Sequence, residues 1–140
     1  MTAKIILVLT VIAAAVLAQA SRSVWDGVFT EAQAKRGEAL FNENCVSCHG
    51  PALEGDGEAP PLSRGELLWA WNGKPLTALY DKIHKEMPHN RPGTLSPEKS
   101  ADLLAYILQF NKFPGGETEL PHDAAALNQI RYESKKPSKK

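Results

Sequence analysis

The pentapeptide Cys45–His49 constrains this chain more than any other stretch. Its two cysteines are the only ones in the 140 residues, they stand three positions apart, and a histidine follows at once. The spacing Cys-x-x-Cys-His is typical of covalent attachment of a c-type haem. Each thiol can reach one haem vinyl group from the same short turn, which also carries the imidazole to the iron. The sequence therefore predicts one haem c attached at Cys45 and Cys48, with His49 as an iron ligand.

Other chemistries also use two cysteines at this spacing. A thioredoxin-like pair needs a βαβ setting, and no strand-rich pattern surrounds this one. A zinc site needs further cysteines or histidines at ligand spacing, which His84, His89 and His122 do not supply. A disulfide between Cys45 and Cys48 would close a very small loop and constrain little. A haem-free thiol–disulfide protein remains an alternative that a pyridine haemochrome spectrum would decide.

The second iron ligand determines whether a haem is closed or open to small molecules. Apart from the initiator, the chain contains one methionine, Met87, directly before Pro88. The proline favours extended backbone at Met87, which would end a helix and hold the thioether in place. We therefore predict Met87 as the second ligand, opposite His49. A core-filling role for Met87, rival ligation by His84 or His89, and an open iron site remain alternatives.

Residues 1–20 have the features of a secretory signal peptide. Lys4 supplies a positive start, Ile5–Leu17 is an apolar run broken only by Thr10, and Ala18–Ala20 matches a cleavage site. We therefore predict an exported, periplasmic protein with no membrane span after cleavage. The alternative is an uncleaved membrane anchor, although the run is shorter than the roughly 20 residues of a spanning helix.

Charge is distributed unevenly along the chain. The 16 basic and 16 acidic residues cancel, so nothing in the whole-chain charge indicates a nucleic-acid partner. Residues 131–140 hold five basic groups and one acid, Glu133, and Lys4 lies in the predicted signal. Residues 21–130 therefore hold the remaining 10 basic and 15 acidic groups. The basic end is either a solvated terminus or a docking arm for an acidic partner or a membrane surface.

Apolar periodicity predicts helices and no sheet. Thr30 with Gln33 forms a capping-box pattern at the start of the first helix, and Ser96-Pro97 is a typical start of the last long one. The segment 50–64 is rich in glycine and proline, so we expect a loop that can cover a flat cofactor. Helices are expected over residues 31–44, 65–72, 75–85 and 97–111, with a weak one over 124–130.

These features, in this order, resemble a bacterial class I cytochrome c over residues 30–111, with an extension to Pro121 left open. The resemblance implies an all-α fold with three to five helices around one covalently attached haem. It also implies that the N- and C-terminal helices cross where Gly37 allows a close approach. The matching motifs are Gly37-x-x-x-Phe41, Cys45–Gly50, Ala59–Leu62, Met87-Pro88 and Leu103–Leu108.

The resemblance also implies roles around the haem. The carbonyl of Pro60, or of the adjacent Pro61, would accept a hydrogen bond from the His49 imidazole and fix its tautomer. Leu62 would contact the ring. An aromatic N–H near a haem propionate could come from Trp69 or Trp71, which otherwise pack in the core, and Arg64 is a weaker candidate for that position.

The resulting prediction is a signal peptide at 1–20, a cytochrome c domain at 21–121 and a basic, partly disordered tail at 122–140. The chain would carry single electrons and catalyse no reaction by itself. Expected partners are a donor dehydrogenase, an acceptor oxidase or another cytochrome. The protein would be a monomer, or a subunit bound tightly to a periplasmic dehydrogenase or oxidase. An open-site haem protein that binds small ligands is the remaining alternative.

Overall fold

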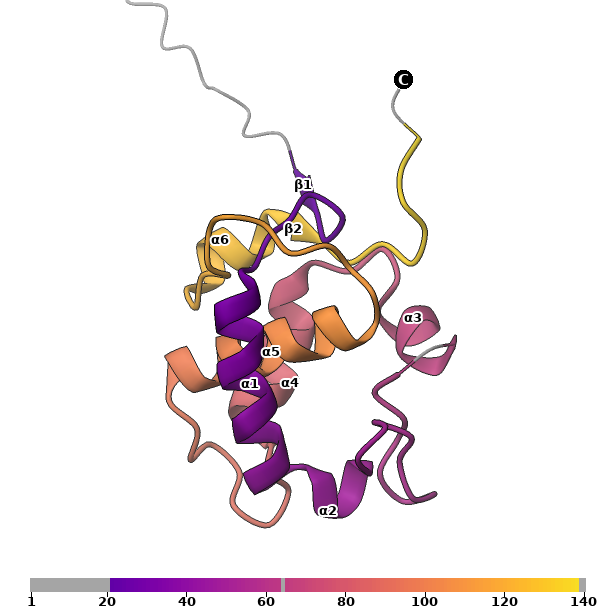
Figure 1. The fold of residues 1–140 in the computed structure, drawn as a ribbon, viewed down its shortest axis with the longest axis vertical. Helices are drawn as coiled ribbons and strands as arrows, with labels where there is room; N and C mark the ends of the chain where they lie inside the picture. The colour runs from indigo at the N-terminus through magenta and orange to yellow at the C-terminus, as the bar shows by residue number, and fades with distance from the viewer. Residues whose placement is uncertain (1–20, 64, 139–140) are drawn as a thin grey trace, which may run out of the picture.

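The computed structural model describes residues 21–63 and 65–138, so the predicted signal peptide and Arg64 lie outside the described residues. The described chain is mostly helical, as predicted (Figure 1). Its elements, in order, are β1 (Arg22–Ser23), α1 (Glu31–Asn44), α2 (Val46–His49), α3 (Gly65–Trp71), α4 (Leu76–Glu86), α5 (Pro97–Phe110), α6 (Ala124–Asn128) and β2 (Ile130–Arg131).

Helix α1 begins where its capping signal predicts, but only half of the capping box forms. The Thr30 hydroxyl accepts a hydrogen bond from the Gln33 N–H at 3.1 Å. The Gln33 side chain does not return to Thr30. Its amide donates to the Leu120 carbonyl at 3.0 Å and accepts from the Leu120 N–H at 2.7 Å. The first turn of α1 is therefore tied to the chain that follows α5.

Helix α1 crosses α5, and this contact is the most extensive between any two elements of the described chain (Figure 1). A Cβ atom on Gly37 would lie 1.9 Å from the Asp102 carbonyl oxygen, so only glycine permits this approach. Beside it, the Arg36 guanidinium makes two hydrogen bonds of 2.9 Å to the Asp102 carboxylate, which raise the pKa of Arg36. The predicted close-approach role of Gly37 is confirmed.

The packed body extends beyond the boundary expected at Pro121. The weak helix predicted there is present as α6, and Leu127, Ile130 and Tyr132 are buried in the core. Strand β2 pairs in parallel with β1, with Arg22 opposite Ile130. Three apolar side chains beyond Pro121 therefore pack with the rest of the fold. Residues 135–138 are exposed and contain no helix or strand.

The segment before α1 is also part of the core. Val24, Val28 and Phe29 are buried. The Trp25 indole N–H donates to the Glu133 carbonyl at 2.8 Å, and its ring packs edge-on against Phe113 at 4.8 Å between centroids. Both ends of the described chain are therefore joined to each other and to the loop after α5. No helix within residues 21–63 and 65–138 is long and apolar enough to cross a membrane.

Candidate cofactor site

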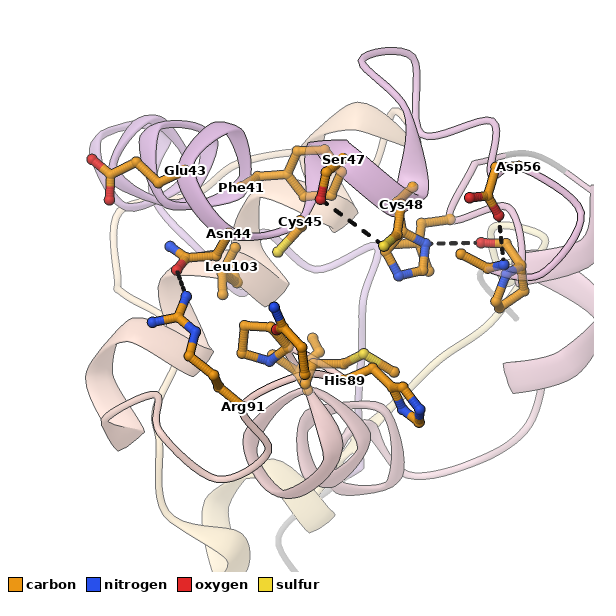
Figure 2. A pocket seen from close by; sticks show the side chains of 18 of the residues that line it. Phe41, Glu43, Asn44, Cys45, Ser47, Cys48, Asp56, His89, Arg91 and Leu103 are labelled. Carbon is orange, nitrogen blue, oxygen red and sulfur yellow. Dashed lines mark hydrogen bonds between the residues drawn. The ribbon is translucent and has the colours of Figure 1, made fainter.

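A cavity of about 500 Å³ lies beside the short helix α2. In Figure 2, Cys45 and Cys48 lie on one side of it, and His89 and Arg91 lie on the other. The apolar part of its lining comes from α1, α4, α5 and the loop before α3. These apolar residues are Phe41, Ala59, Pro60, Leu62, Ile83, Met87, Pro88, Leu103 and Ile107.

The two cysteines line the cavity as free thiols. Cys45 ends α1, where its N–H donates to the Phe41 carbonyl, and α2 begins at the next residue. Burial, and then the nearby Cys48 thiol, raises the pKa of Cys45 to about 11. Within the described residues, no three His, Cys, Asp or Glu side chains gather as a metal site.

The buried imidazole of His49 also lines the cavity, and one of its nitrogens is already engaged. Its Nδ1 lies 2.9 Å from the carbonyl oxygen of Pro60, not that of Pro61. A carbonyl can only accept, so Nδ1 carries the proton and Nε2 keeps a lone pair. The loop that brings Pro60 here turns at Gly55, whose φ is +74° and whose N–H donates to the His49 carbonyl at 2.8 Å.

Met87 lines the same cavity immediately after α4. Its backbone is extended, with φ −112° and ψ 152°, and its N–H donates to the Ile83 carbonyl at 3.2 Å. The two rival histidines differ. His84 is absent from the cavity lining; its Nδ1 lies 3.0 Å from the Ser100 hydroxyl and its ring stacks on Tyr80. His89 does line the cavity, but its side chain is exposed (Figure 2).

Two polar anchors at the cavity were not predicted from the sequence. Arg91 donates to the Asn44 side-chain oxygen at 3.2 Å and so joins the end of α1 to the loop after α4 (Figure 2). The Asn111 amide donates to the carbonyls of Leu62 and Ile107, at 2.9 and 2.8 Å, and fixes the loop before α3 to the end of α5. The Arg91–Asn44 and Asn111–Leu62 bonds join distant segments, and the sequence contains no local signal for such pairs.

Acidic side chains lie at the cavity. Exposed Glu43, Asp56 and Glu58 are among its lining residues. The Asp56 carboxylate accepts the Ala59 N–H at 2.8 Å and the Glu58 N–H at 3.1 Å, and these bonds lower the pKa of Asp56. This carboxylate therefore keeps its negative charge across the physiological pH range.

Neither tryptophan of α3 lines the cavity. Trp69 is 85% exposed, the most exposed large apolar side chain of the described residues. Trp71 is half-buried, and the Lys74 ammonium lies 5.0 Å from the centre of its ring. The structure does not bring either indole to the residues that line the cavity.

The cavity residues fit a covalently attached haem. Two free thiols lie beside an imidazole whose Nε2 is available, and a thioether lines the same cavity. The lining is mainly apolar, and the volume falls in the range of about 300–1,000 Å³ typical of ligand sites. All four sulfur and imidazole groups expected from the sequence are therefore in one place.

Comparisons with known proteins agree with this chemistry. Residues 32–107 match the family described as cytochrome C oxidase, cbb3-type, subunit III. The chain is 28% identical over 90 residues to the "Cbb3-type cytochrome c oxidase subunit FixP" of Sinorhizobium medicae, covering 56% of this chain and 30% of that protein. The FixP of Bradyrhizobium sp. is 26% identical over 109 residues, covering 71% and 37%.

A solved structure is also similar. The sulfane dehydrogenase SoxCD from Paracoccus pantotrophus includes a chain that superposes with a TM-score of 0.55 and 27% sequence identity. The match covers 76% of this chain and 61% of that one. The alignment spans about a third of the length of each curated FixP relative, so the activities of those whole proteins do not transfer directly.

Proposed function

The chain belongs to the mono-haem cytochrome c family described as cytochrome C oxidase, cbb3-type, subunit III, and from this premise we propose that it carries single electrons with His49 and Met87 as iron ligands. Family membership implies one covalently bound haem c with iron. Cys45 and Cys48 are the thiols that would hold it. The observation that carries the proposal is that all four side chains line one cavity.

The bound haem would supply reversible one-electron chemistry at its iron. The protein residues would keep the iron's surroundings constant. The Pro60 carbonyl holds the His49 proton on Nδ1 and orients the ring, so Nε2 is presented in one tautomer. Pro88 and the end of α4 keep Met87 extended beside the cavity. Ligands held this way need little rearrangement when the electron arrives or leaves.

Apolar packing would keep water from the site. Phe41, Leu103 and Ile107 are buried side chains that line the cavity from the crossing helices α1 and α5. A dry, thioether-ligated iron has a raised reduction potential and no position for oxygen or peroxide. Electron transfer therefore accounts for this lining better than small-ligand binding does.

Voltammetry of the haem-loaded protein, together with its optical response to carbon monoxide, tests this function. We expect one reversible one-electron wave, and no carbon monoxide binding by the ferrous protein. Met87→Ala should lower the potential by on the order of 0.2 V and open the iron to carbon monoxide. His89→Ala is the matched control and should change neither property. Carbon monoxide binding by the wild-type protein would instead support an open-site haem protein.

A second candidate function is a fixed subunit of a larger oxidoreductase. Its support is that the FixP relatives are oxidase subunits by name, and the similar structure is that of a dehydrogenase. Under this proposal, and with residues 1–20 as an export signal, the partners are exported redox enzymes. Size-exclusion chromatography of native extract distinguishes the two: co-elution with a larger redox enzyme supports the subunit, and elution at the mass of the single mature chain supports a free carrier.

A further inference from the structure

The chain enters and leaves the fold at the same end of the molecule. Strands β1 and β2 pair with Arg22 opposite Ile130 and Ser23 opposite Arg131. Figure 1 shows these strands and the C-terminal segment at one end of the longest axis, with α2 at the other end. We call the first end, made of β1, β2, residues 73–75 and residues 133–138, the terminal pole. The end that carries α2 and its cavity is the cavity pole.

Basic residues from three separate segments lie at the terminal pole. The Tyr132 N–H donates to the Lys74 carbonyl at 2.9 Å, and the Arg131 guanidinium donates to the Gly73 carbonyl at 3.2 Å. These bonds hold the loop before α4 against β2, which is itself paired with β1. The exposed basic residues brought together in this way are Arg22, Lys74, Arg131, Lys135 and Lys136.

The positive charge of this group is not neutralised within the described chain. None of the five basic side chains takes part in an ion pair among residues 21–63 and 65–138. The acids near this end include Asp26, Glu117, Asp123 and Glu133. Asp26 accepts the Ser23 N–H at 2.7 Å, and Asp123 caps α6. The sequence adds two further lysines at its end, beyond the described residues.

The distribution of charge along the molecule favours a flat anionic partner at the terminal pole. The cavity pole carries exposed Glu43, Asp56 and Glu58 against one exposed arginine, Arg91. An anionic surface would therefore attract one end of the molecule and repel the other. In the sequence, the apolar run Ile5–Leu17 ends five positions before Arg22.

From these observations we propose that the terminal pole docks on an anionic phospholipid surface, with Arg22, Lys74, Arg131, Lys135 and Lys136 contacting lipid phosphates. Docking in this direction leaves the cavity pole facing away from the lipid, where a redox partner can approach it. The interaction does not depend on whether residues 1–20 are removed, because the basic groups belong to the folded chain.

Vesicle binding tests the proposal. Haem-loaded protein, with its N-terminus established by mass spectrometry, is sedimented with vesicles of phosphatidylcholine alone or mixed with phosphatidylglycerol. We expect binding at least about tenfold tighter to the anionic vesicles, and lost as salt is raised. The triple variant Arg131→Gln/Lys135→Gln/Lys136→Gln should lose most of this preference.

A matched control separates the effect of charge at the terminal pole from the effect of the protein's net charge. The triple variant Lys35→Gln/Lys82→Gln/Lys99→Gln removes the same charge from exposed positions on α1, α4 and α5 and should keep the preference. Amide hydrogen exchange should slow on vesicle binding at residues 130–136 and not at 43–58. An equal loss of the preference for anionic vesicles in both triple variants would overturn the proposal. Equal binding to both vesicles, with salt-dependent retention on a polyglutamate resin instead, would assign the pole to an acidic protein and also overturn it.

Discussion

The two poles of this molecule are built in different ways. At the cavity pole, the groups that would hold a haem come from short local motifs: Cys45–His49 in one turn, and Met87 beside Pro88. At the terminal pole, a two-residue strand near the start of the chain pairs with one near its end. The haem-binding residues can therefore be recognised from short local motifs, whereas the packing that supports them depends on contacts between distant segments.

The largest expected effect tests whether the terminal pole belongs to the folded body. Leu127 on α6 is completely buried. Leu127→Ala should lower the free energy of unfolding by about 3.5 kcal/mol, since it removes a packed side chain and leaves a cavity. Guanidinium denaturation of the ferric protein measures it. Gln129→Ala, at an exposed position nearby, is the control and should change stability by less than about 0.5 kcal/mol. A domain that ends at Pro121 would make both variants neutral.

A smaller effect is expected for the loop that holds His49 at the cavity pole. Gly55 and Gly57 both have positive φ, +74° and +93°. A Cβ on Gly55 would lie 2.4 Å from the Ala59 carbonyl oxygen, whereas one on Gly57 would meet nothing within 4 Å. Gly55→Ala should therefore cost about 3 kcal/mol of unfolding free energy, and Gly57→Ala only about 1 kcal/mol. Equal costs would mean that the loop relaxes freely around residue 55.

The smallest effect has the opposite sign. The Tyr132 hydroxyl is buried and has no hydrogen-bond partner in the described chain, so Tyr132→Phe should raise stability by about 1 kcal/mol. Burial also raises the pKa of Tyr132 in the folded protein. The phenol of the unfolded chain therefore ionises first, so this contribution to the free energy of unfolding is fully present below about pH 10 and falls as the pH rises further. Denaturation at neutral and alkaline pH should show a shallower alkaline loss in the variant. A destabilised variant would reveal a partner for the hydroxyl.

Much of the cavity pole could be predicted because its signals are local. The spacing Cys-x-x-Cys-His and the proline after Met87 each act within a few residues. The resemblance to class I cytochromes c added the Pro60 carbonyl, and the structure places it at hydrogen-bond distance from His49.

The terminal pole could not be predicted in the same way. Strands of two residues show no periodicity. Helix α6, which carries Leu127, packs on α4, and Tyr132 packs on Phe113 and donates its N–H to the Lys74 carbonyl, so these contacts join distant segments. The second contact of Gln33 has the same origin, since its side chain prefers the distant Leu120 backbone to the cap beside it. Long-range pairs of this kind become visible only when the chain is folded.

The oxidised and reduced optical spectra test the central claim, ligation by His49 and Met87, most directly. With these two ligands, both oxidation states should give low-spin spectra. The ferric protein should also show a weak far-red sulfur-to-iron band. Met87→Ala should abolish that band, and His89→Ala should keep it. A ferric wild-type protein without the band, or a band that survives in Met87→Ala, would contradict the account.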